Sequence, residues 1–364
     1  MLDTFTQLGY FPFLVIISML AVFSVMPSIL HVCRERKLFD SPVGFRKMHD
    51  HGIPRLGGMA IFFSFVLSVL CFTHSETIIP LKPLIVACIL ISAISLKDDL
   101  VGVDAFKKFF LHVFVSALLV TWGNIRLGSL HGIFGIYALD EISSTLISIG
   151  LITYIVNAFN LIDGINGLAG TIGLIASLVF GIGFIVSGQR ELAAVALCLS
   201  GAIAGFLRYN FNPAKIFMGD TGAYLIGIVL SILALRFIEI NPLGSGEHTE
   251  NASFSFAMAV LVVPLFDTFR VVVIRLSQGR SPFDADSNHI HHKLLRSGMS
   301  HPQIVITLVL FNVLVLWTAW MMADFNCFWT MLFTASECVI FNAFTTHLQG
   351  SGKVARFSFR NFLW

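Results

Sequence analysis

The chain has 364 residues, of which 56% are hydrophobic and 12% charged, with a mean hydropathy of +0.85 and a formal net charge of +2. A soluble protein has roughly half apolar and a quarter charged residues, so this composition excludes an ordinary soluble enzyme, and we expect no nucleic-acid partner. Continuous apolar runs of about 20 residues recur from end to end, whereas a β-barrel would show alternation. The predicted fold class is therefore all-α, a polytopic protein of the lipid bilayer.

The apolar runs predict about eleven transmembrane helices, which would place the two termini on opposite sides. The first run is too long for the core of a signal peptide, so we expect it to be retained as a helix. No connection is long enough for a soluble domain. We therefore expect one integral-membrane domain over residues 1–364, with a core at about 45–300 and flanking spans at about 11–32 and 303–345. The spans should begin near Phe11, Pro54, Lys82, Lys107, Ile142, Gly167, Glu191, Gly222, Ser253, Gln303 and Asn326.

Basic residues then orient the chain. If the first loop is cytoplasmic, 19 of the 23 lysines and arginines fall on the cytoplasmic side. Cytoplasmic loops of membrane proteins carry such an excess. The polar motifs fall on the same side, which predicts a site at the cytoplasmic face of the membrane. The six cysteines stand singly and lack the spacing of a zinc site or a disulfide framework.

Two clusters precede the middle of the chain. The first, FRKMHDHGIPRLGG (45–58), combines bases with glycines; its bases either anchor the next span or bind substrate, with Lys47 as the candidate. The second, KDDLVGVDAFKK (97–108), has the adjacent carboxylates Asp98 and Asp99 at the end of a span. Such a pair suits metal binding or proton abstraction, and Lys108 could hold a phosphate, but a solvated helix cap remains open.

The third cluster consists of NAFNLIDGINGLAG (157–170) and NPAKIFMGDTGA (212–223). Asn160, Asp163 and Asn166 are spaced by three, which on a helical turn would place them on one face. Their oxygens suit a hard cation such as Mg²⁺. Asp220, between glycines, is interpreted as a loop ligand that opens the next helix. The competing interpretation is a pair of ordinary tight turns.

The fourth cluster is SPFDADSNHIHHKLLRSG (281–298), where His289, His291 and His292 stand close to Arg296. Zinc would need other spacing and further ligands. We therefore predict hydrogen bonding to a diphosphate or a nucleotide. Asp267 is a further candidate for a buried carboxylate.

Together these motifs resemble the polyprenyl-phosphate N-acetylhexosamine-1-phosphate transferases (glycosyltransferase family 4), in particular their undecaprenyl-phosphate N-acetylglucosamine branch. The similarity runs from about residue 46 to residue 298. It implies an enzyme that uses Mg²⁺, for which Mn²⁺ can substitute, with a UDP-N-acetylhexosamine donor, an undecaprenyl phosphate acceptor and UMP as the leaving product. The resemblance also implies a bacterial inner membrane, where the product would start a cell-surface polysaccharide.

The resemblance also assigns roles by position. It implies catalytic roles for Asp98, Asp99 and Asp163, with Asp98 as a base or a contact of the acceptor phosphate. Asn166 stands where most bacterial relatives carry Asp, which argues against an obligatory base there. The implied metal ligands are Asn160 and Asp220, and the implied substrate-binding residues are Lys47, Lys108, Asn166, His289, His291, His292 and Arg296.

Two alternatives remain. A phospho-N-acetylmuramoyl-pentapeptide transferase is a more distant relative, and the His-x-His-His run argues against it. An ion-coupled transporter would also use membrane carboxylates, but near the bilayer midplane instead of at span ends. The sequence leaves open which UDP-amino sugar is used, which glycan is built and whether the protein forms a homodimer.

Overall fold

The computed structural model describes residues 2–39, 52–72, 81–211, 213–241, 243, 252–282, 284 and 288–351. In these residues the chain forms helices joined by short loops, together with one two-stranded sheet. In chain order the elements are α1 (Leu2–Glu35), α2 (Gly57–Phe72), α3 (Leu81–Val101), α4 (Ala105–Thr121), β1 (Ser129–Ile133), β2 (Ile136–Ala138), α5 (Glu141–Ile162), α6 (Leu168–Val186), α7 (Arg190–Asn210), α8 (Gly219–Ile240), α9 (Ala252–Val260), α10 (Val262–Ser277), α11 (Ile290–Arg296), α12 (His301–Met321) and α13 (Cys327–Ser351).

The long helices confirm an all-α, polytopic membrane protein. Among the described residues, 7 helices are long and apolar enough to cross a membrane, or up to 8 if the bent pair α9 and α10 is one span. Every predicted span coincides with a helix or with this pair. However, α2 and α4 are shorter than a typical span, and α3 ends in the charged run 97–99. The number of spans therefore stays a prediction.

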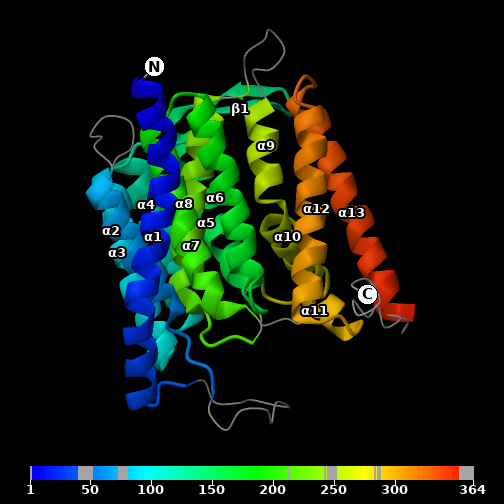
Figure 1. Cartoon of the computed structure of the whole chain (residues 1–364). Helices are drawn as coiled ribbons and strands as arrows, with labels where there is room; N and C mark the ends of the chain where they lie inside the picture. The colour runs from blue at the N-terminus through cyan, green and yellow to red at the C-terminus, as the bar shows by residue number, and fades with distance from the viewer. Residues whose placement is uncertain are drawn as a thin grey trace, which may run out of the picture.

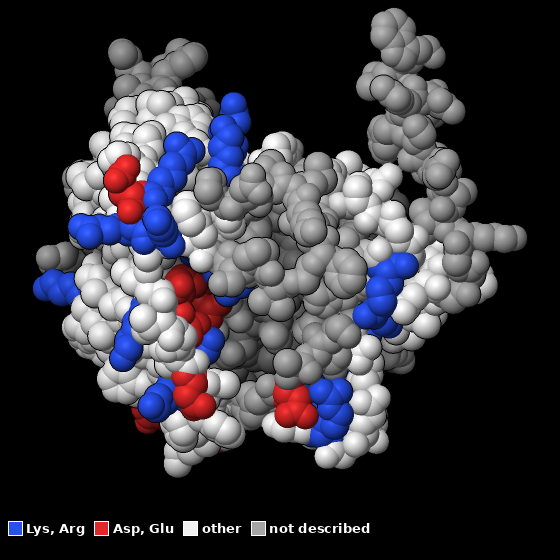
Figure 2. Space-filling model, turned by 90° about the horizontal axis from the view of Figure 1, so that it is seen from below, with Lys and Arg blue, Asp and Glu red and all other residues white. Residues whose placement is uncertain are grey.

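The helices run alternately from one end of the bundle to the other (Figure 1). Helix α1 begins at the upper end in this view and α13 finishes at the lower end, so the described chain starts and finishes at opposite ends. The motifs in the described residues lie at the lower end. Figure 2 shows that lysine and arginine side chains are spread over this end, with a group of acidic side chains near its middle.

Helix α8 lies at the centre of the bundle and is buried along nearly its whole length. It packs closely because two contacts involve glycine. A Cβ on Gly58 of α2 would lie 2.1 Å from the backbone nitrogen of Gly222, and a Cβ on Gly227 would lie 2.8 Å from the Cα of Val156 in α5. Small residues allow such close approach between membrane helices. The first turn of α8, which carries Asp220, is thereby fixed between its neighbours.

A short β-hairpin between α4 and α5 departs from the purely helical prediction. β1 and β2 pair antiparallel, with Ser129 opposite Ala138 and Ile133 opposite Ile136. Gly135, at the turn, has a φ of 76°, a conformation that glycine adopts without steric cost. The strands are only 5 and 3 residues long, too short for alternation to reveal them. The hairpin lies at the upper end, away from the motifs (Figure 1).

The span expected near Ser253 is broken, not continuous. α9 and α10 meet at an angle of 78°. Pro264, in the first turn of α10, has no N–H for the carbonyl of Val260, and its ring would clash with that carbonyl in a straight helix. The fully buried Asn312 of α12 donates Nδ2 to the carbonyls of Ala259 at 3.1 Å and Val260 at 3.5 Å. A neighbouring helix thus supplies a donor at the break, as an apolar environment requires.

We expect Asn312→Leu to lower the thermal unfolding midpoint of the detergent-solubilised protein. A side-chain hydrogen bond between membrane helices contributes about 1 kcal/mol, and the Val260 carbonyl would lose its donor. Thr307→Val is the matched control, because that hydroxyl bonds to Gln303 of its own helix. In a Pro264→Ala background the helix supplies its own donor, so the cost should shrink. An equal loss in both backgrounds contradicts the assignment.

Candidate active site

Asp99, near the end of α3, caps the first turn of α8. Its carboxylate accepts the backbone N–H of Asp220 at 2.8 Å, the backbone N–H of Thr221 at 3.1 Å and the Thr221 hydroxyl at 2.7 Å. The start of a helix has unsatisfied N–H groups and a partial positive charge, so an ionised carboxylate is favourable there for both reasons. This contact fixes Asp220 against the end of α3.

Asp98 and Asp220 share one lysine. Lys108 of α4 donates Nζ to Oδ2 of Asp98 at 2.7 Å and to Oδ2 of Asp220 at 3.1 Å. Asn160, near the end of α5, donates Nδ2 to Oδ1 of Asp220 at 2.8 Å. The backbone N–H of Val103 holds Asp98 from the other side at 2.5 Å. Four helices, α3, α4, α5 and α8, thus contribute to one hydrogen-bonded network.

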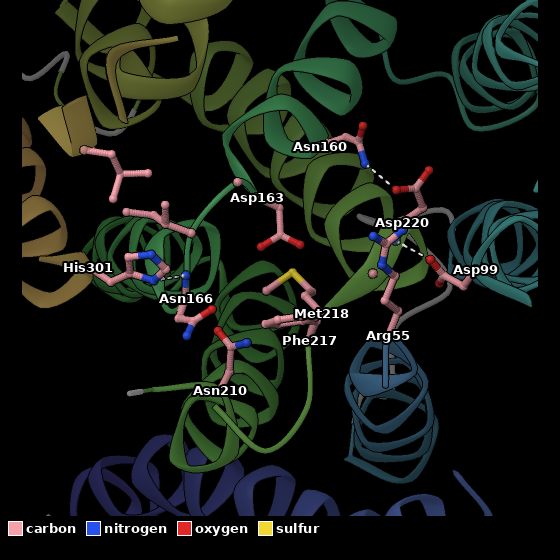
Figure 3. A pocket seen from close by; sticks show the side chains of 14 residues that line it. Arg55, Asp99, Asn160, Asp163, Asn166, Asn210, Phe217, Met218, Asp220 and His301 are labelled. Atoms are coloured by element: carbon pink, nitrogen blue, oxygen red, sulfur yellow. Dashed lines mark hydrogen bonds between the residues drawn. The ribbon is translucent and has the colours of Figure 1, made fainter. Parts of the chain in front are cut away.

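The segment before α2 is joined to the segment before α8 through the backbone. Phe217 donates its N–H to the carbonyl of Pro54 at 2.8 Å, and its own carbonyl accepts the N–H of Gly57 at 2.9 Å. These bonds fix the backbone of the intervening Arg55. Figure 3 shows its side chain directed toward Asp220.

Asn160, Asp163 and Asn166 do not lie on one helical face, as their spacing predicted. Helix α5 ends one residue before Asp163, whose ψ of 38° is not helical, and a turn follows. Gly167 closes this turn with a φ of 82°, and its N–H donates to Oδ1 of the buried Asn210 at 2.8 Å. The helical interpretation of Asn166 was therefore wrong, because glycines in the turn end the helix before it.

The three side chains nevertheless meet around a cavity of about 530 Å³, which we call the polar cavity. In Figure 3, Asp163 points into its middle, Asn160 points to Asp220, and Asn166 lies near His301. The backbone N–H of Asn166 faces Nδ1 of His301 at 3.4 Å. The lining residues are Arg55, Asp99, Asn160, Asp163, Gly164, Ile165, Asn166, Asn210, Phe217, Met218, Gly219, Asp220, Leu295 and His301.

The Asp163 carboxylate accepts no hydrogen bond from the described part of the chain. Burial, together with repulsion from Asp220 and Asp99, raises the pKa of Asp163 well above its usual range, while the charge of Arg55 opposes this shift. A nearby cation would stabilise the ionised form. Asp163 therefore lacks a described donor that would stabilise its ionised form, and a cation bound in the polar cavity would supply that stabilisation.

The residues of the polar cavity fit Mg²⁺ as a partial ligand set that substrate phosphates and water would complete. Among the residues that the structure describes, no group of three His, Cys, Asp or Glu side chains forms a metal site by itself. Mg²⁺ commonly uses only one or two protein carboxylates and takes further ligands from substrate phosphates and water. Asp220 and Asp163 could supply the carboxylates. Asn160 retains its amide oxygen, since it donates to Asp220 through Nδ2.

A second cavity, of about 660 Å³, lies between α4, α5, α10 and the histidine segment, and we call it the apolar-walled cavity. It shares Asn160, Asp163 and Gly164 with the polar cavity. Its lining residues are Ala105, Lys108, Phe109, Val113, Ile149, Gly150, Thr153, Tyr154, Asn157, Asn160, Leu161, Asp163, Gly164, Tyr224, Thr268, Val272, Arg275, Pro282, Asp284, His289, His291 and His292.

The three histidines of the fourth cluster all line the apolar-walled cavity. The rings of His289 and His291 are stacked at 5.7 Å, and those of His291 and His292 lie 4.3 Å apart. His291 packs on Gly164, where a Cβ would lie 2.1 Å from its Nε2, so the turn after α5 needs glycine here. Burial, with the charge of His292, lowers the pKa of His291 to about 3, which keeps the ring neutral.

Most of the predicted site residues come together, one described residue does not, and one candidate lies outside the described residues. Arg296 lies on the exposed side of α11 and lines neither cavity. Lys47 falls outside the described residues. The remaining candidates belong to the network or to one of the two cavities, namely Asp98, Asp99, Lys108, Asn160, Asp163, Asn166, Asp220, His289, His291 and His292.

Three residues of the polar cavity were missed by sequence reasoning: Arg55, Asn210 and His301. Arg55 was counted only among the bases of the first cluster. Asn210 and His301 stand at the end and the start of apolar runs, where a single polar residue usually marks only a membrane boundary. A useful signal was available for Asn210, because it stands two residues before the run 212–223 of the third cluster.

Comparisons with known proteins identify the family of the chain. A family model described as glycosyl transferase family 4 matches residues 81–238. The chain is 36% identical over 287 residues to a decaprenyl-phosphate N-acetylglucosaminephosphotransferase of Mycolicibacterium smegmatis, covering 73% of this chain and 70% of that protein. It is 30% identical over 338 residues to a probable undecaprenyl-phosphate N-acetylglucosaminyl 1-phosphate transferase of Bacillus subtilis, covering 92% and 91%. An Escherichia coli O157:H7 undecaprenyl-phosphate alpha-N-acetylglucosaminyl 1-phosphate transferase is 28% identical over 337 residues, covering 90% and 88%. With this sequence identity, the chain belongs to glycosyl transferase family 4.

Proposed function

We propose that the protein transfers N-acetylglucosamine 1-phosphate from a UDP-sugar to a polyprenyl phosphate such as undecaprenyl phosphate. The products are a lipid-linked diphosphate sugar, which starts a surface polysaccharide, and UMP. The observation that carries this proposal is the junction of the two cavities at Asn160, Asp163 and Gly164. A water-soluble donor and a membrane-bound acceptor need such a meeting point. The names of the relatives point to the same class of acceptor and sugar.

The chemistry of the polar cavity suits the donor. Asn166 and His301 offer amide and imidazole groups for hydrogen bonds to a nucleotide, while Asn210 holds the backbone of the turn beside them. Arg55 faces the carboxylates. From this position its guanidinium could bind two oxygens of a diphosphate in a bidentate manner. The phosphates of a UDP-sugar would then lie beside Asp163 and Asp220.

The apolar-walled cavity suits the lipid acceptor. Phe109, Val113, Ile149 and Val272 provide apolar walls, and Lys108 lies at the polar part of the same cavity. The helices that form it also expose large apolar side chains, among them Leu146 of α5, which is 64% exposed. An isoprenoid chain could therefore remain in contact with the bilayer while its phosphate reaches the junction.

In the reaction, an oxygen of the acceptor phosphate forms a bond to the β-phosphorus of the donor, and the bond from that phosphorus to the oxygen of UMP breaks. A phosphate monoester has a second pKa near 6, so the acceptor is largely ionised at neutral pH and needs little help from a base. Asp98 holds the ammonium group of Lys108 at 2.7 Å. We therefore assign Asp98 to orienting the acceptor phosphate, directly or through Lys108.

The proposed cofactor is Mg²⁺, for which Mn²⁺ can substitute, held by Asp220 and Asn160 with Asp163 close by. When bound, it would neutralise charge on the donor diphosphate. Asp99 has a different role from Asp98, because all its described contacts are with the start of α8. It positions Asp220, and we assign it no contact with the reacting atoms.

The ion-coupled transporter is the weaker alternative. A transporter places its carboxylates near the middle of the membrane. Here Asp98 and Asp99 lie near the end of α3, Asp163 directly follows α5, and Asp220 opens α8. All of these positions are at one end of the bundle (Figure 1). This arrangement supports chemistry at a membrane surface, which we place on the cytoplasmic side of the inner membrane.

We expect Asp220→Asn to abolish transfer from radiolabelled UDP-N-acetylglucosamine to undecaprenyl phosphate without changing the thermal unfolding midpoint. Losing a charged metal ligand removes transition-state stabilisation on the order of several kcal/mol. Asp140→Asn is the matched control, since it changes an exposed cap at the other end of the bundle and Asn is an equally good cap. Full turnover in excess EDTA would refute the metal assignment.

The two adjacent aspartates should differ in their effects. Asp98→Asn should lower turnover by a similar factor at every pH, because the acceptor phosphate is already ionised. Asp99→Asn should instead lower the thermal unfolding midpoint, because the amide has one acceptor oxygen for three donors. The measurement is a pH–rate profile for each variant beside an unfolding curve. If the Asp98→Asn defect largely disappears above about pH 8, Asp98 is a general base after all.

Cysteine labelling of intact cells tests the sidedness. With the exposed Cys71 replaced, Phe134→Cys in the hairpin should react with a membrane-impermeant maleimide, whereas Arg296→Cys in α11 should react only after the membrane is opened. The two positions lie at opposite ends of the bundle (Figure 1). The reverse labelling pattern means that the site faces outward.

A further inference from the structure

A buried carboxylate on α10 has no part in the mechanism described so far. Asp267 is 2% exposed and accepts three hydrogen bonds. Its Oδ1 accepts Nη2 of Arg270 at 2.8 Å and the backbone N–H of Ile290 at 2.9 Å. Its Oδ2 lies 2.9 Å from Nδ1 of His289, a residue 22 positions further along the chain. A carboxylate with three donors is held in its ionised form.

This contact determines which nitrogen of His289 carries a proton. An ionised carboxylate can only accept, so Nδ1 must be the donor. In the neutral ring, Nε2 then bears the lone pair, and in the charged ring it bears a second proton. In the described part of the chain, His289 makes this one side-chain hydrogen bond, and it lines the apolar-walled cavity. Nε2 is the nitrogen left for a ligand there.

Arg270 makes the same unit rigid. Its Nη2 binds Asp267 and also the backbone carbonyl of Asn288, the residue directly before His289. Arg275, one turn further along α10, binds the carbonyl of Pro282 at 2.5 Å. Helix α10 therefore holds the backbone of the segment before α11 through its two arginines, and the side chain of His289 through Asp267. Because Arg270 offsets the charge of Asp267, the carboxylate can remain buried.

We propose that Asp267 is a positioning residue that acts through His289. It holds the ring with Nδ1 protonated and directs Nε2 toward a phosphate group at the junction of the two cavities. A phosphate oxygen at the junction would accept a hydrogen bond from Nε2 of the charged ring. This role rests on the proposed transferase function, because the phosphate is that of a substrate.

A double-mutant cycle tests the dependence on His289. Asp267→Asn should lower kcat/KM for the transfer by about 10- to 100-fold, by analogy with the loss of a carboxylate behind a metal-bound histidine. In a His289→Gln background the same change should have much less effect, because the residue it acts through is absent. Asp267→Glu, which keeps a carboxylate, should recover part of the activity. Equal fold losses in both backgrounds overturn the proposal.

The proton position can be measured without any activity. In ¹⁵N-histidine-labelled protein in micelles, the His289 signal, identified by its loss in His289→Gln, should be that of a ring protonated at Nδ1. In Asp267→Asn the amide must keep its oxygen toward Arg270 and Ile290, so its NH₂ group faces His289 and the proton moves to Nε2. A wild-type ring protonated only at Nε2 overturns the proposal even if Asp267→Asn does not fold.

The two readouts separate this inference from the proposed function. If the expected proton position is found but no UDP-N-acetylhexosamine is turned over, the transferase proposal fails and the Asp267–His289 contact stands. If the transfer is observed and the cycle is additive, the function stands and the positioning role fails. Asp140→Asn again serves as the matched control, with wild-type activity and an unchanged His289 signal expected.

Discussion

The contact between the Asp99 carboxylate and the start of α8 is the interaction on which the site depends. Asp99 accepts three donors from Asp220 and Thr221, and so joins the end of α3 to the first turn of a helix that is buried along nearly its whole length. Asp220 is then close enough to share Lys108 with Asp98 and to accept from Asn160. Without this cap, the first N–H groups of α8 would lack a partner. Asp220 would then no longer be held beside Lys108, Asp98 and Asn160.

The same constraint acts at two further places where described helices end. In an apolar surrounding, every backbone group that leaves a helix needs a partner. Asn312 provides one where Pro264 breaks α9 from α10, and Asn210 provides one where the turn after α5 reaches Gly167. The break in turn sends α10 along the apolar-walled cavity, where Asp267 can hold the histidine segment. Polar side chains placed for stability thus also define the cavities.

The charges at the junction are arranged differently. Asp98, Asp99 and Asp220 are each bound by donors, whereas Asp163 accepts no hydrogen bond from the described part of the chain. Its raised pKa, caused by burial and by the neighbouring carboxylates, marks the point where a cation would have most effect. That point is shared by both cavities, which is where a phosphate chain and a divalent ion would be needed together.

The sequence by itself determined the class of fold, the gathering of the motifs at one end and the family resemblance, because apolar length, charge bias and short motifs are local properties of the chain. The tertiary structure alone decided which residues of those motifs contact one another and which line the cavities. Asp99 contacts a residue 122 positions away, Asn166 lies in a turn instead of on α5, and Arg296 is exposed and lines neither cavity. Arg55, Asn210 and His301 join the site only because three separate helix ends meet there. Helical spacing predicts which residues share a face of one helix, but it contains no information on which helix ends pack together. That depends on long-range contacts, such as the glycine approach of α2 to α8.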